Sequence, residues 1–168
     1  MKVILVMAQT LDGKIARSSD HFPDWTGAED KKFFAEKSRG IGVMIFGRQT
    51  FETLPGLLPG RLHVVMSRKA RKWEEKSKNL IMTCLRPSEI LRKLEALGFR
   101  EVLLGGGRVI NSLFAEKSLI DEIFVTVSPL VFGKGLGIFR ENIALDLSLV
   151  NCKNISNEVM LFHYKVKK

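Results

Sequence analysis

The sequence is poor in cysteine and has no long apolar run, so it does not have the pattern of a disulfide scaffold or a membrane span. Only two cysteines occur among 168 residues. Cys84 and Cys152 lie far apart, match no metal-ligand spacing and indicate reduced thiols in a cytoplasmic protein. The apolar run at residues 3–8 is short and is followed by polar Gln9 and Thr10, so it predicts a buried strand rather than a signal peptide.

No internal repeat, low-complexity segment or linker divides the chain, so we expect a single domain over residues 1–168. The three histidines are dispersed, and no catalytic triad or cluster of metal ligands is recognisable, so we expect no metal ion. The dinucleotide fingerprint G-x-G-x-x-G of an ordinary Rossmann domain is also absent.

Acidic residues are in the minority: 18 Asp and Glu stand against 27 Lys and Arg, which gives a net charge of +9. A basic protein attracts nucleic acid, and it also attracts small ligands that carry phosphate or carboxylate groups. The basic residues are dispersed, aromatic residues make up only 8%, and no nucleic-acid-binding motif is present. We therefore expect a small-molecule partner and neither nucleic acid nor membrane, with nucleic-acid binding as the competing class.

The hydrophobic pattern predicts an α/β fold. Apolar runs rich in β-branched residues predict buried strands at residues 3–8, 43–46, 63–67, 80–84, 101–104 and 123–127. Helical spacing predicts helices at residues 28–38, 88–97 and 109–114, and Gly40 and Gly98 are expected to end the first two. Residues 145–150 and 159–164 predict antiparallel additions, so the expected sheet is mostly parallel with an antiparallel C-terminal edge and helices on both faces.

Glycines mark the ends of two predicted strands. Gly105, Gly106 and Gly107, followed by Arg108, precede a predicted helix, where backbone amides can approach a phosphate. Gly47 and Arg48 follow a second strand, at the position where open α/β sheets place ligands. Tight turns without a ligand are the alternative.

Basic residues follow two strands that the sheet can bring together. If these strand ends are neighbours, Arg48, Ser67 and Arg68 form a cluster that suits a 2′-phosphate, which favours NADPH over NADH. Ordinary surface charge is the alternative.

Asp30 is the candidate acid. It lies one helical turn from Phe34 and close to Phe33, and a carboxylate on a partly apolar face is a candidate for a perturbed pKa. A simple preference of Asp30 for the helix N-terminus is the alternative, and Glu29 is a rival for the same role.

Together these motifs resemble dihydrofolate reductase, in the order and close to the spacing of that family over roughly residues 3–140. The matching elements are Trp25 with Asp30 and Phe34, the run Gly47-Arg48-Gln49-Thr50-Phe51-Glu52, Leu58-Pro59-Gly60-Arg61 with Ser67, and Gly105-Gly106-Gly107-Arg108-Val109. The resemblance implies a dihydrofolate-reductase-like three-layer fold, NADPH as the cofactor, and hydride transfer from nicotinamide C4 to C6 of 7,8-dihydrofolate.

The resemblance also implies a role for each matching residue. Asp30 would hold the pterin and promote protonation of N5 through water, Thr126 would support Asp30 by a hydrogen bond, and Trp25 would lie at the edge of the active-site loop. The implied substrate-binding residues are Met7, Ala8, Phe34 and Arg61, with Arg61 pairing the carboxylate of a glutamate tail. The implied NADPH-binding residues are Ala8, Ile15, Gly47, Arg48, Gln49, Thr50, Ser67, Arg68, Gly105, Gly106, Gly107, Arg108 and Val109. A cis peptide bond is expected between Gly105 and Gly106.

Three other segments look more like the reductase domain of riboflavin biosynthesis, a relative of the same fold: residues 11–16, 119–123 and 129–135. That reductase acts on a ribosylated aminopyrimidine phosphate. The loop at residues 17–24 also departs from the dihydrofolate reductase pattern, because it has no clear counterpart of the loop methionine and lacks the proline expected shortly before the acid.

Two features favour dihydrofolate as the substrate. Riboflavin-type reductases generally lack an acid at the position of Asp30, and they lack the Leu-Pro-Gly-Arg element. The aminopyrimidine phosphate or another pteridine is the alternative substrate, and a scaffold that only binds a nucleotide is a further one. Apolar residues at 123–139 are compatible with a homodimer or with a core.

Overall fold

The structure, a computed structural model, describes residues 1–19, 21 and 24–168. The strands are β1 (Lys2–Thr10), β2 (Val43–Gly47), β3 (Leu62–Met66), β4 (Glu74–Ser77), β5 (Leu80–Thr83), β6 (Glu101–Leu104), β7 (Glu122–Ser128), β8 (Leu147–Asn154) and β9 (Met160–Val166). The helices are α1 (Ala28–Ile41), α2 (Arg48–Glu52), α3 (Pro87–Ala96) and α4 (Arg108–Ala115). Residues 20, 22 and 23 of the loop at 17–24 lie outside the described residues.

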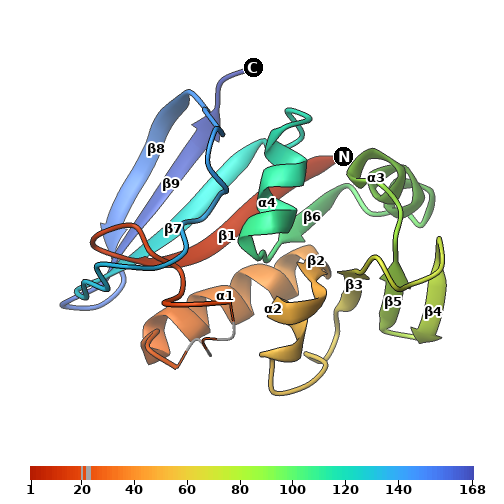
Figure 1. The fold of residues 1–168 in the computed structure, drawn as a ribbon, viewed down its shortest axis with the longest axis horizontal. Coiled ribbons are helices and arrows are strands. Elements are labelled where there is room, and N and C mark those ends of the chain that lie inside the picture. The colour runs from red at the N-terminus through yellow and green to blue at the C-terminus, as the bar shows by residue number, and fades with distance from the viewer. Residues whose placement is uncertain (20, 22–23) are drawn as a thin grey trace.

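The strands form one nine-stranded sheet in the order β4-β5-β3-β2-β6-β1-β7-β9-β8 (Figure 1). Strands β5, β3, β2, β6, β1 and β7 are parallel to one another, and β9 and β8 complete the C-terminal edge in antiparallel fashion. The predicted α/β fold with a mostly parallel sheet and an antiparallel C-terminal edge is therefore confirmed. The opposite edge is antiparallel too, because β4 pairs with β5 in that sense.

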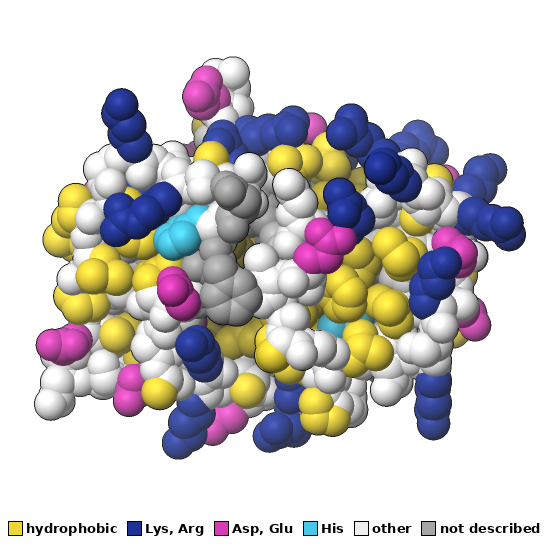
Figure 2. Space-filling view, turned by 60° about the horizontal axis from the view of Figure 1, so that its bottom comes forward, with side chains coloured by type: hydrophobic (Ala, Val, Ile, Leu, Met, Phe, Trp, Pro, Cys, Tyr) yellow, Lys and Arg dark blue, Asp and Glu magenta, His cyan; other side chains and the backbone are white. Residues whose placement is uncertain are grey.

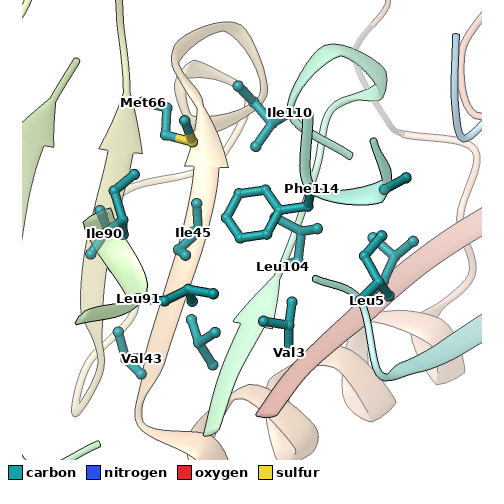
Figure 3. Packing of buried hydrophobic residues seen from close by; sticks show 14 of the residues in the cluster. Val3, Leu5, Val43, Ile45, Met66, Ile90, Leu91, Leu104, Ile110 and Phe114 are labelled. Carbon is teal, nitrogen blue, oxygen red and sulfur yellow. The ribbon is translucent and has the colours of Figure 1, made fainter. Parts of the chain in front are cut away.

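Helices cover both faces of the sheet, and alternate residues of each central strand point to opposite faces. Val3 and Leu5 of β1 join the cluster that α3 and α4 cover with Ile90, Leu94 and Phe114 (Figure 3). Ile4 and Val6 point the other way, into the cluster against which Phe33 and Phe34 of α1 and Phe51 of α2 pack. The core is thus split into two layers by the sheet, and α1 lies on the face opposite to α4.

Helix α1 ends later than predicted, and the short helix α2 was not predicted at all. Helix α1 continues through Gly40 to Ile41, whose side chain packs against both clusters, and it ends at Gly42, which has the left-handed φ of 80°. Helix α2 was not predicted, because five residues are too short to show a helical period.

Two strands at the edges also differ from the pattern. Strand β4 (sequence Glu-Glu-Lys-Ser) was not predicted because it has no apolar residues to alternate. Strand β8 runs four residues beyond the expected end at residue 150, and all eight of its residues are exposed. Polar or exposed edge strands carry little hydrophobic signal.

Lys and Arg side chains lie mainly around the edges of the face shown in Figure 2, in keeping with a dispersed positive charge. Over the described parts of the chain, no helix combines the length and the apolar character needed to span a bilayer.

Candidate active site

The predicted contact between Asp30 and Thr126 is present. Strand β7 places Thr126 beside Ala8 of β1, and α1 carries Asp30 over this pair of strands. The Oγ1 of Thr126 donates a hydrogen bond to Oδ1 of Asp30 at 2.5 Å. Burial raises the pKa of the Asp30 carboxyl, while the hydroxyls of Thr126 and Thr26 and the charge of Lys31 act in the opposite direction. Glu29, the rival acid, is exposed.

The other side chains expected around the substrate lie on the same elements. Phe34, one turn beyond Asp30, packs on the apolar cluster under α1. Met7 extends from β1 toward the glycine turn, where a Cβ on Gly106 would come within 3.1 Å of its sulfur. Trp25 precedes α1, and its indole Nε1 is buried with no hydrogen-bond partner among the described residues.

The two glycine-marked strand ends meet, as the sheet order requires. Strands β2 and β6 are neighbours, and the backbone N–H of Gly47 donates to the carbonyl of Gly106 at 2.7 Å. A Cβ on Gly107 would lie 2.7 Å from Oγ1 of Thr50, and one on Gly105 would lie 2.2 Å from the ring of Phe46. Side chains larger than hydrogen therefore do not fit where these turns touch.

The cis peptide bond was predicted one position too early. It joins Gly106 to Gly107, and no cis bond is present between Gly105 and Gly106. Gly105 is instead the residue directly after β6, where the backbone lies against the ring of Phe46 and the Gly105 N–H donates to the carbonyl of Ile45. A row of three glycines does not show by itself which pair forms the turn.

The basic residues expected near a phosphate sit on adjacent strand ends. Strand β3 pairs with β2, which brings the segment that starts at Ser67 next to Gly47. Arg68 is exposed, and Arg48 is exposed and bridges to Glu52 of its own helix at 2.7 Å. Because an exposed ion pair of this kind is worth little, Arg48 stays available for a stronger anion. Gln49 is also exposed on α2.

Helix α4 begins directly after the third glycine of the turn. Arg108 is its first residue, and the Nε of that side chain is buried without a partner among the described residues. Val109 follows and is 39% exposed. Paired glycine turns, a helix N-terminus and an unpaired guanidinium nitrogen together fit the phosphates of a dinucleotide, so these residues are compatible with NADPH.

Arg61 stands apart from this cluster, at the beginning of β3. Only 3% of the residue is exposed, and its Nε and Nη1 have no hydrogen-bond partner among the described residues. Burial, together with the nearby charge of Arg39, lowers the pKa of its guanidinium. A buried cation without a partner is costly, and an anionic ligand would relieve that cost.

The neutral ring of His63 fixes the segment before Arg61. The Leu58 N–H donates to Nε2 of His63 at 3.1 Å, and Nδ1 of the same ring donates to the carbonyl of Asn79 at 3.2 Å. Burial lowers the pKa of this imidazole, in agreement with a ring that accepts at one nitrogen.

Two segments that resemble the riboflavin-type reductase pack against each other. Leu11 donates its N–H to the carbonyl of Leu130, and Ile15 donates to that of Leu136, the residue after the second segment, both at 2.8 Å. The carboxylate of Asp12 accepts from the N–H groups of Phe132 and Gly133 at 3.1 and 2.8 Å. Sequence reasoning assigned no role to Asp12 or Phe132, although it singled out both segments, because nothing in the sequence showed that they are in contact.

A groove of about 420 Å³ lies on another flank of α1, between Phe33 and Ile155, and Asp30 does not line it. Among the described residues, no group of His, Cys, Asp and Glu side chains is placed to hold a metal ion.

Comparisons with known proteins give a family and one local similarity. YwjB of Bacillus subtilis (strain 168) is 27% identical over 148 residues, which cover 83% of this chain and 83% of that protein. Dihydrofolate reductase type 9 of Escherichia coli is 50% identical over only 44 residues, which cover 26% of this chain and 24% of that enzyme.

A solved structure shows the same fold. The diaminohydroxyphosphoribosylaminopyrimidine deaminase/5-amino-6-(5-phosphoribosylamino)uracil reductase of Thermotoga maritima superposes with a TM-score of 0.80 at 21% identity. The match covers 99% of this chain and 56% of that one.

These findings correct the family expected from the motifs. The similarity to dihydrofolate reductase is confined to a short stretch of sequence, whereas the family model named RibD C-terminal domain matches residues 1–161. The chain therefore belongs to the RibD C-terminal domain family.

Proposed function

We propose that this chain is an NADPH-dependent reductase whose substrate is a ribosylaminopyrimidine phosphate. The observation that carries the proposal is the family match over residues 1–161. The structure from Thermotoga maritima that shares the fold is named as a reductase of a phosphoribosylaminouracil, which is a substrate of this class. The contact between segments 11–16 and 129–135 gives further support, because both resemble the riboflavin-type reductase.

The proposed cofactor site is the edge of the sheet where β2, β3 and β6 end. The glycine turn from Gly105 to Arg108, with Val109 and Thr50 beside it, would approach the pyrophosphate. Arg48, Ser67 and Arg68 would take the 2′-phosphate, with Gln49 beside them. Ala8 and Ile15 would line the nicotinamide end of this site.

NADPH, when bound, supplies a hydride from C4 of its nicotinamide. Reduction of a C=N or C=O group also needs a proton on the heteroatom, and Asp30 is the group we propose to deliver it through water. Its raised pKa keeps part of the carboxyl protonated at a higher pH than usual, and Thr126 fixes its orientation. The hydride and the proton together make up the two-electron reduction.

A second candidate is the reduction of dihydrofolate, and two observations of the site favour it. The acid on α1 is present and hydrogen-bonded by Thr126, and the buried guanidinium of Arg61 offers a partner for a glutamate carboxylate. The local identity of 50% to dihydrofolate reductase type 9 points the same way.

The test is NADPH oxidation measured with the ribosylaminopyrimidine phosphate and with dihydrofolate in parallel. Turnover of the pyrimidine supports the proposal. Turnover of dihydrofolate alone supports the second candidate. NADPH binding without oxidation in either assay would leave a nucleotide-binding scaffold and overturn both.

A further inference from the structure

The ring of Phe132 is the centre of a cluster with three residues that precede α1 in the sequence, namely Arg17, His21 and Trp25. The indole of Trp25 meets it edge-on, with ring centroids 5.3 Å apart and planes at 77°. The imidazole of His21 lies 5.6 Å away in a similar geometry, and the guanidinium carbon of Arg17 lies 4.0 Å from the ring centroid. Edge-to-face and cation–π contacts of this kind fix the orientation of the rings.

The backbone that carries Phe132 is held firmly. Asp12 accepts from the N–H groups of Phe132 and Gly133, and it also accepts from Oγ1 of Thr10 at 2.5 Å. The hydrogen bond from Thr10, with those from the backbone, lowers the pKa of Asp12 to about 2. The carboxylate therefore stays ionised at any pH at which the protein would work. Its hydrogen bonds hold the backbone that carries the ring of Phe132 in place.

Trp25 is the residue on which this cluster acts. Its Nε1–H is buried and has no acceptor among the described residues. An indole nitrogen is only a donor, and buried donors in folded proteins normally have a partner. Thr26, the next residue, acts through its hydroxyl on the Asp30 carboxyl, so Trp25 is adjacent in sequence to a residue that contacts the proposed acid.

We propose that Phe132 is a positioning residue, which holds the Trp25 indole so that its N–H meets an acceptor on the substrate heterocycle. The inference rests on the proposed function, because it places the substrate beside Asp30. A ring carbonyl of a pyrimidine or pteridine is the kind of acceptor that this donor would recognise. Sequence reasoning gave Phe132 no role.

The experiment uses the full chain carrying Trp73→Phe, so that Trp25 is the sole tryptophan. Phe132→Leu keeps an apolar side chain and the backbone bond to Asp12 but removes the ring, and Phe132→Tyr keeps the ring. Val131→Ala is the matched control, because Val131 is adjacent and 65% exposed. For each variant, acrylamide quenching of Trp25 is measured together with KM and kcat for NADPH and for the accepted heterocycle.

We expect Phe132→Leu to make Trp25 more quenchable and to raise the KM of the heterocycle about threefold to tenfold, the cost of one misplaced hydrogen bond. The KM of NADPH should change less than about twofold, and Phe132→Tyr should behave like the parent. Unchanged quenching and unchanged KM in Phe132→Leu would overturn the inference, as would equal increases in both KM values. If the parent reduces neither substrate, the proposed function fails, and unchanged quenching would still refute the contact separately.

Discussion

At the scale of single residues, a buried carboxyl such as that of Asp30 lowers the stability of the fold when it is ionised. Its pKa is raised above the ordinary value of 3.8 because of burial. The protonated form therefore stabilises the native state at low pH, and this stabilisation is lost as the pH rises through the raised pKa. A residue selected for folding alone would not be acidic here, which is consistent with a functional role.

We predict that Asp30→Asn lowers turnover about 10²- to 10⁴-fold at neutral pH, because the proton donor is removed. Low pH should partly restore the rate through a substrate that is already protonated. The Tm at neutral pH should not fall, because the amide can still accept from Thr126 and a buried charge is gone. Glu29→Gln, in the same helical turn but exposed, is the control, and full activity of Asp30→Asn at every pH would refute the assignment.

Arg61 separates the two candidate substrates. If it pairs a glutamate carboxylate, Arg61→Leu should weaken dihydrofolate and methotrexate-like ligands about tenfold or more and leave NADPH affinity unchanged. Calorimetric titration with each ligand measures this. Arg39→Leu is the control, because Arg39 is exposed and acts only through its charge. Equal losses for the cofactor and the substrate analogue would indicate a structural arginine instead.

At the scale of elements, the turns after β2 and β6 are in close contact. A single methyl group added at Gly107 should disturb this contact. Gly107→Ala places a Cβ 2.7 Å from Oγ1 of Thr50, so either the Thr50 side chain must rotate or the two turns must move apart. We expect NADPH affinity to fall about tenfold or more, measured by fluorescence titration, since close backbone approach to a phosphate depends on this geometry.

Two variants control that experiment. Thr50→Ala removes the clashing oxygen, so adding Gly107→Ala to Thr50→Ala should cost less NADPH affinity than adding Gly107→Ala to the parent. Gly40→Ala lies in α1 with no atom within 4 Å of the new Cβ, and it should stabilise the protein by about 0.5–1 kcal/mol without affecting NADPH. An unchanged affinity in Gly107→Ala would show that the turn does not hold the cofactor.

The elements that the sequence predicted are those whose apolar residues repeat with a clear period. The central strands and helices α1, α3 and α4 were found within a few residues of their ends. Helix α2 and strand β4 were missed because one is too short and the other too polar to show a period. Gly40 was taken as the end of α1, but the packing of Ile41 carries the helix on to Gly42.

The candidate site was predictable where a family resemblance supplied the pairing of residues, and less so where segments distant in sequence meet without such a resemblance. The bond from Thr126 to Asp30 was expected from a resemblance and is present. The contact of Asp12 with Phe132 spans 120 residues, and no local pattern shows it. The sequence likewise does not reveal which two of the three glycines share the cis bond, or that Phe46 and Thr50 lie against this turn.

At the scale of the whole molecule, one carboxylate links three strands at the amino end of the sheet. Glu122 of β7 lies 2.9 Å from Nζ of Lys2 on β1 and 3.0 Å from Nε2 of His163 on β9. Burial acts to raise the pKa of Glu122, but the hydrogen bonds from Lys2 and His163 outweigh it and hold the pKa below 4.5. A carboxyl with a lowered pKa contributes stability above its unfolded value, and this contribution is lost as the pH falls.

We therefore predict that the Tm of the parent falls as the pH drops below about 4.5, and that Glu122→Gln has a lower Tm at neutral pH but a flatter decline. Scanning calorimetry between neutral and acidic pH measures this. Glu101→Gln is the control, because Glu101 contacts the same lysine at 3.5 Å but is far more exposed. Parallel curves for the parent and Glu122→Gln would show that the cluster adds nothing.

The proposed function requires that a hydride moves from NADPH to a heterocyclic substrate held between Asp30 and the paired glycine turns. The test is mass spectrometry of the product formed from the ribosylaminopyrimidine phosphate with NADPH that carries deuterium at both hydrogen positions of nicotinamide C4. We predict one deuterium on the reduced carbon of the product, and formation of this product about 10²- to 10⁴-fold more slowly in Asp30→Asn at neutral pH. A product without deuterium would refute the proposed hydride transfer. The absence of any product with the parent protein, while NADPH is bound, would refute it as well.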